Sequence, residues 1–98
     1  MGNVISARLH RRVRRDFPDV HTAARVEVAL RQLASDMANS LQDTERLLAA
    51  AVFTAEGDLG RLYVAVQEPD FRDLLVGGEL AHEDWPAVLD EELGPPVP

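Results

Sequence analysis

Apolar residues recur at helical spacing along most of this chain. The second predicted helix has the clearest pattern, because its apolar positions alternate spacings of three and four residues, as in a helix packed lengthwise on a neighbour. These positions are Ala23, Val26, Leu30, Leu33, Met37 and Leu41. A first helix is predicted over residues 4–15, where Ile5, Leu9 and Val13 recur every four residues and Pro18 follows as a stop signal.

Residues 44–67 allow two interpretations. As helix, they present two apolar stripes separated by the breaker Glu56-Gly57-Asp58, in which Asp58 is a suitable N-cap. The stripes are Leu48, Val52 and Ala55, then Leu59, Leu62, Tyr63 and Val66. As strands, the same stretch would form a β-hairpin at about 47–67 around a glycine-containing turn. The run of three alanines at 49–51 favours the helical interpretation.

The last third of the chain predicts two further short helices. Asp70 is a suitable cap for the first, which buries Phe71, Leu74 and Leu75 and weakens at Gly77-Gly78. His82-Glu83-Asp84 opens the second, with Pro86 in its first turn and Gly94 at its end. Its buried face consists of Trp85, Val88, Leu89 and Leu93. The predicted fold is therefore all-α, a compact bundle of about five to six short helices in a single domain over residues 1–94, with a disordered tail at 95–98; the alternative is α+β.

Composition agrees with close helix packing and excludes several classes of protein. Apolar residues make up 46% of the 98 residues, and 13 of them are alanine. The chain has no cysteine, which excludes disulfides, thiolate metal sites and a cysteine nucleophile. Its longest apolar run, residues 47–53, is far shorter than the roughly 20 residues of a membrane span. With no secretion signal at its start, the chain is predicted to be cytoplasmic.

Charge is distributed unevenly along the chain. The net charge is −7, yet residues 1–15 contain five basic residues and no acid, whereas residues 68–98 contain nine acids and the single base Arg72. The five are Arg8, Arg11, Arg12, Arg14 and Arg15. Two interpretations follow. Either the basic helix packs near the acidic tail, or its arginines are free to bind phosphate groups or anionic lipid.

The C-terminal half of the chain contains two clusters of residues that resemble a group of known sequences. The clusters Asp70-Phe-Arg-Asp-Leu-Leu-Val76 and Leu80-Ala-His-Glu-Asp-Trp-Pro-Ala-Val-Leu-Asp-Glu-Glu-Leu-Gly94 resemble the C-terminus of small uncharacterised proteins of high-GC, actinobacterial-type bacteria. The absence of lysine and the many alanines agree with a high-GC genome. The resemblance covers residues 45–94 and implies helical structure over 44–67 and a bacterial cytoplasm. Because those proteins have no known function, the resemblance implies no role for any residue.

No arrangement typical of catalysis, cofactor binding or metal binding is found. His10, His21 and His82 are scattered, and the consecutive residues His82-Glu83-Asp84 point in different directions on a helix, so that a capping role is expected. Asp90-Glu91-Glu92 is interpreted as a solvated face. No serine lies in a nucleophile motif and no glycine loop has the spacing of a phosphate loop. The chain is therefore predicted not to be an enzyme and to have no cofactor.

The function expected from the sequence is binding of another macromolecule, foremost a protein partner. The long second helix offers a seam for a homodimer. An alternative is binding of nucleic acid or an anionic membrane through Arg8, Arg11, Arg12, Arg14 and Arg15. Residues 1–6 also match the pattern for N-myristoylation at Gly2, and a basic patch is the usual second signal for such an anchor.

Overall fold

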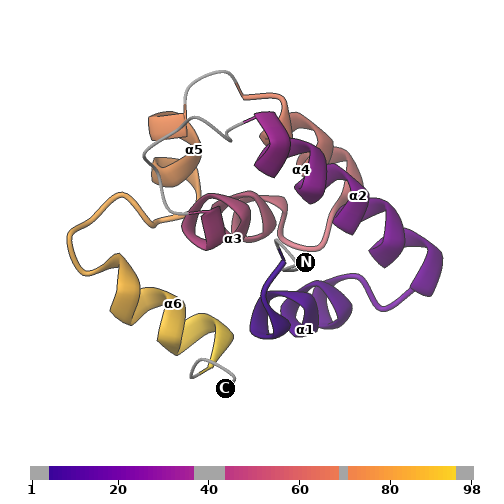
Figure 1. The fold of residues 1–98 in the computed structure, drawn as a ribbon, viewed down its shortest axis with the longest axis horizontal. Coiled ribbons are helices and arrows are strands. Elements are labelled where there is room, and N and C mark those ends of the chain that lie inside the picture. The colour runs from indigo at the N-terminus through magenta and orange to yellow at the C-terminus, as the bar shows by residue number, and fades with distance from the viewer. Residues whose placement is uncertain (1–4, 37–43, 69–70, 95–98) are drawn as a thin grey trace.

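A computed structural model describes residues 5–36, 44–68 and 71–94, which form six helices and no strand (Figure 1). The helices are α1 (Ala7–Asp16), α2 (Val20–Asp36), α3 (Thr44–Ala55), α4 (Leu59–Val66), α5 (Phe71–Gly77) and α6 (Trp85–Leu93). The all-α prediction is confirmed, and the alternative of a hairpin at about 47–67 is wrong. The predicted tail at 95–98, Gly2, and the Asp70 cap lie outside the described residues.

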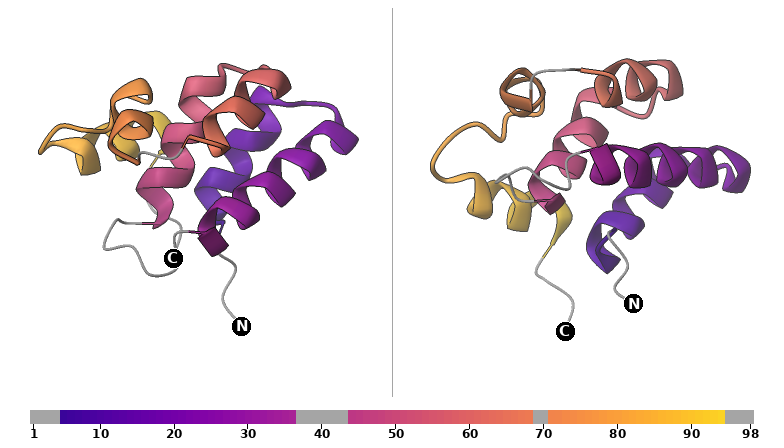
Figure 2. Two further views of the ribbon diagram at one scale, coloured as in Figure 1. Left: turned by 90° about the horizontal axis from the view of Figure 1, so that it is seen from above. Right: turned by 45° about the horizontal axis from the view of Figure 1, so that its top comes forward.

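Helix α3 lies at the centre and packs against all five other helices (Figure 2). The predicted stripe of Leu48, Val52 and Ala55 is fully buried. The remaining residues from 47 to 52 are buried as well, so that α3 has almost no solvent face. Its three consecutive alanines have small side chains, so the backbones of the neighbouring helices can approach α3 closely. One buried cluster includes residues of all six helices.

Helix ends follow local capping chemistry. Ser6 is the N-cap of α1, and its hydroxyl oxygen accepts a hydrogen bond from the Leu9 backbone N–H at 3.3 Å, so α1 begins later than the predicted residue 4. Before α2, Asp19 accepts from the backbone N–H and the hydroxyl of Thr22, which holds the pKa of Asp19 below its usual value. Asp58 caps α4 as predicted, and Gly57 before it has a φ of 80°.

The apolar stripes of α2 and α6 are confirmed where they are described. Ala23, Val26, Leu30 and Leu33 are buried on α2, while the predicted positions Met37 and Leu41 lie outside the described residues. On α6, Leu89 and Leu93 are buried, and Trp85 and Val88 pack partly buried against the core. Asp84 occupies the N-cap position of α6, but its side chain makes no capping hydrogen bond, so the predicted capping role is wrong for that carboxylate.

Helix α4 corrects one assignment. Tyr63 was predicted in its buried stripe but is 38% exposed, and Ala65 is buried in its place beside Leu62. The helix turns about 100° per residue, so Leu62 and Ala65, three apart, share the face toward α3, while Tyr63 and Val64 lie outside it. Ala65 is small, so its buried position is not apparent from the pattern of large apolar residues.

Helices α3 and α5 approach each other closely at the end of α5. Leu74 and Leu75 are buried there as predicted, and α5 ends at Gly77. A Cβ atom on Gly78 would lie 2.6 Å from the Ala50 Cα atom and 2.8 Å from the Ala50 carbonyl oxygen. Such distances are too short for any side chain, so the close packing of these two helices requires glycine at this position.

Candidate functional site

Arg8, the first of the predicted polyanion-binding residues, is a buried structural residue. Its guanidinium donates two hydrogen bonds to Glu45 of α3, from Nε to Oε2 at 2.9 Å and from Nη2 to Oε1 at 2.6 Å. Its Nη1 donates to Asp90 Oδ1 of α6 at 2.6 Å and to the Gly94 carbonyl oxygen at 3.0 Å. Of the two interpretations of the basic helix, packing near the acidic tail therefore holds for Arg8, which joins α1 to α3 and α6.

The Arg8–Glu45 contact makes the stability of the fold depend on pH. Hydrogen bonds from Arg8, and then from the Ser6 hydroxyl, hold the pKa of Glu45 below its usual value, against the opposing effect of partial burial. The same hydrogen bond raises the pKa of Arg8, so its charge persists throughout the ordinary pH range. Because the folded state binds the Glu45 proton less tightly than the unfolded state, this contribution to stability is present at neutral pH and lost on acidification.

We therefore expect Glu45→Gln to flatten the acid limb of the stability curve. In the unaltered chain the free energy of unfolding should fall steeply from about pH 5 toward about pH 3, and in the variant it should fall less steeply. Urea unfolding at a series of pH values measures both slopes. Glu91→Gln, at an exposed position on α6, is the control that should leave the slope unchanged; equal slopes for the two variants would contradict the assignment.

Arg11 and Arg12 also bind the end of α6. Arg11 Nη2 donates to the Leu93 carbonyl oxygen at 3.2 Å, and Arg12 Nη1 donates to the backbone oxygen of Glu92 at 3.1 Å and to its carboxylate at 3.2 Å. Carbonyls at the end of a helix lack partners within the helix and carry partial negative charge, so arginines satisfy them well. Two of the acids at 90–92, interpreted above as a solvated face, are thus paired with α1.

The last two predicted arginines have a different environment. Arg14 and Arg15 are exposed, and their side chains make no hydrogen bond or ion pair within the described residues. Of the two interpretations of the uneven charge, the structure shows packing of the basic helix against the acidic C-terminal helix for Arg8 and Arg12. Binding of a polyanion by Arg14 and Arg15 stays a prediction.

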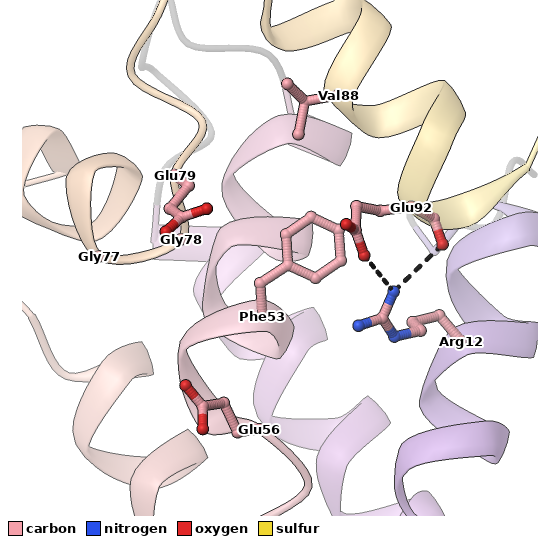
Figure 3. A pocket seen from close by; sticks show the side chains of 8 residues that line it. All are labelled: Arg12, Phe53, Glu56, Gly77, Gly78, Glu79, Val88 and Glu92. Atoms are coloured by element: carbon pink, nitrogen blue, oxygen red, sulfur yellow. Dashed lines mark hydrogen bonds and ion pairs between the residues drawn. The ribbon is translucent and has the colours of Figure 1, made fainter.

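A polar pocket of about 230 Å³ lies where α1, α3 and α6 meet the end of α5 (Figure 3). The Arg12 guanidinium lies over the Phe53 ring at 4.9 Å from its centroid. Of the three glutamates that line the pocket, Glu92 binds Arg12, whereas Glu56 and Glu79 lie across the pocket from it (Figure 3). Arg12 also donates to Asp16 at 3.0 Å. Arg12 thus donates hydrogen bonds to two carboxylates and one backbone carbonyl of its own chain. Within the described residues, no group of three His, Asp or Glu side chains converges as metal ligands do.

Helix α4 lies between α2 and α5 (Figure 2), and because a groove runs along each side of it, its exposed side chains form a ridge. A groove of about 390 Å³ separates it from α2 and is lined by Ala24, Arg25, Val28, Ala29, Gln32 and Tyr63. A second groove, of about 470 Å³, separates α4 from α5 and includes Gly60, Val64, Ala65, Asp73, Leu74 and Gly77. We call the ridge and its two grooves the α4 face.

Large apolar side chains are exposed on the α4 face. Val64 on α4 is 73% exposed and Val28 on α2 is 62% exposed, with the partly exposed Tyr63 in the same groove as Val28. Both valines lie off the buried stripes of their helices. Each is an apolar residue on the polar side of an amphipathic helix, and that is the signal in the sequence by which they can be found.

Comparison with known proteins gives no match to a protein family, a curated protein or a solved structure. The resemblance of residues 45–94 to actinobacterial proteins therefore stays a prediction. None of the six described helices combines the length and the apolar character needed to cross a membrane.

Proposed function

We propose that this chain is a non-catalytic, cytoplasmic helical protein that binds another protein, and that the α4 face is its contact surface. The observation that carries the proposal is the exposure of Val28 and Val64 beside two grooves lined largely by aliphatic and small residues. Exposed apolar patches rimmed by polar residues mark interaction sites, and tyrosine is enriched in them.

The internal contacts of α1 weigh against the polyanion alternative. Arg8, Arg11 and Arg12 already donate hydrogen bonds to Glu45, to Asp90 or to the end of α6. A phosphate would have to compete with these carboxylates and carbonyls for the same donors. Only Arg14 and Arg15 of the five are left for such a ligand, whereas the affinity of a protein for nucleic acid grows with the number of phosphates that it neutralises.

Photo-crosslinking in the native cells tests the proposal. With a benzophenone amino acid in place of Val28, we expect irradiation to give a covalent adduct with a protein. The same amino acid in place of Ala87, an exposed residue of α6, is the control that should give none. Adding Val64→Glu to the Val28 probe should abolish the adduct, because the charge enters the same contact surface.

Circular dichroism checks that each variant keeps its helices. An adduct from position 87 as strong as that from position 28, or no adduct from position 28, would contradict the proposal. So would an adduct at position 28 that is unaffected by Val64→Glu, because the two residues would then not belong to one binding surface.

A further inference from the structure

We infer that the protein bound at the α4 face is a second copy of this chain, with the α4 ridge of each copy seated in the α4–α5 groove of the other. This inference rests on the proposed function, and it names the partner. It is carried by two features of the face: the shape of α4 and its grooves, and the distribution of charge on either side of them.

The shape of the α4 face is complementary to itself. A ridge flanked by a groove is what one helix needs to pack on another, since the side chains of one enter the depression beside the other. The α4–α5 groove has glycine on both walls, Gly60 on α4 and Gly77 on α5. These positions carry no side chain, so they leave space for the exposed Val64 of an incoming α4.

Exposed basic residues lie on the α2 side of α4, and an exposed acid lies on its α5 side. On the α2 side, Arg25 and Arg31 lie one turn before and one turn after Val28, and neither side chain has a hydrogen bond or short ion pair within the described residues. Arg25 is the charged residue that lines the groove between α2 and α4 at Val28, whereas the acid Asp36 lies farther along α2, near Val66. On the α5 side, the charged residues lining the groove are Arg61, Glu68 and Asp73. Arg61 forms an ion pair with Glu56 at 3.4 Å, and Arg72 lies next to Asp73 on α5, so Asp73 is the acid of this side that the proposed dimer uses.

In a dimer with two-fold symmetry, these basic and acidic residues of the two copies attract each other. In a closed dimer the same patch of both copies forms the interface. An axis parallel to α4, running between the two α4 helices, places the α2 side of each copy over the α5 side of the other. Arg25 of one copy then faces Asp73 of the second, and the same pair forms again on the other side of the axis. A net charge of −7 opposes self-association, and these two pairs offset that repulsion locally.

The test is the mass of the purified chain measured by light scattering. We expect about twice the monomer mass of 10.8 kDa. Val64→Glu should give the monomer mass. Asp73→Arg alone, and Arg25→Glu with Arg31→Glu, should each weaken self-association by about tenfold or more, because like charges then meet at both sides of the axis. Circular dichroism confirms that each exposed substitution leaves the helices intact.

Mixing the two charge-reversed variants gives the decisive measurement. In the mixed dimer each reversed side again meets a side of opposite charge, so native mass spectrometry of an equal mixture, one variant carrying a mass tag, should show the heterodimer in excess over both homodimers. Failure of the mixture to dimerise would overturn the two-fold arrangement. A dimer unaffected by Val64→Glu would overturn it as well, because the interface would lie elsewhere.

The failure of this inference differs from the failure of the proposed function. A wild-type chain that stays monomeric up to about 100 µM, where a weak dimer is already populated, overturns the inference. If the crosslinking probe at position 28 then still captures a different protein in cells, the proposed function stands. If the probe captures nothing, both fail.

Discussion

Arg8→Met should destabilise the fold by about 3 kcal/mol, the cost of removing one partner from a buried ion pair. The Arg8 side chain is only 8% exposed and joins Glu45 to Asp90, so its loss leaves the partly buried Glu45 carboxylate without its cation. Methionine keeps the aliphatic length of arginine, which separates the loss of charge from the loss of packing. For a domain of this size, the melting temperature should fall by at least about 10 °C.

The control for this prediction is Arg14→Met, the same change on the same helix at an exposed position, which should alter the free energy of unfolding by no more than about 0.5 kcal/mol. The double variant Arg8→Met, Glu45→Met should be more stable than Arg8→Met alone, because no unpaired carboxylate is then left in the interior. Urea unfolding measures all three. Equal effects of Arg8→Met and Arg14→Met would show that the Arg8 contacts contribute little.

Gly78→Ala should destabilise the fold by about 2–3 kcal/mol through overpacking. The added methyl group would lie against the Cα atom and the carbonyl oxygen of Ala50, which are backbone atoms of the central helix and cannot rotate away. Helices α3 and α5 would have to separate, exposing part of the interface that buries Leu74 and Leu75. Thermal and urea unfolding measure the decrease in the free energy of unfolding.

Gly77→Ala is the matched control, because the neighbouring glycine has a different environment. Its added Cβ atom would meet only the side chain of Thr54, with Oγ1 at 3.2 Å, and alanine is the better helix former. We expect a change of less than about 1 kcal/mol in either direction. A loss at position 77 as large as that at position 78 would show that the close approach to Ala50 is not the cause.

Local chemistry in the sequence predicts most of the elements of this fold. The spacing of Ala23, Val26, Leu30 and Leu33 defines α2, and the order Gly57-Asp58 marks the boundary between α3 and α4, because capping depends on near neighbours only. The sequence does not show that α3 is buried on every side. An apolar stripe predicts a helix that keeps a solvent face, whereas residues 47–52 of α3 are buried on all sides by the other helices.

The role of Arg8 depends on residues far along the chain. Arg8 and Arg12 follow Ile5 and Leu9 by three positions, which places both beside the apolar stripe of α1. The spacing alone does not identify the arginines that pack, because Arg15 lies seven residues after Arg8, on nearly the same side of the helix, and is exposed. Their partners are 37 and 82 residues away for Arg8, at Glu45 and Asp90, and no periodicity within one helix can identify them.

The hydrogen bonds between α1 and α6 also affect when the chain can complete its fold during synthesis. Asp90 and the Gly94 carbonyl are translated 82 and 86 residues after Arg8. Contacts between such distant residues form late, because the intervening chain must first be made and ordered. Until α6 has been made, the Arg8 guanidinium lacks the Asp90 and Gly94 acceptors, so we expect α1 to reach its final packing only after α6 has been translated.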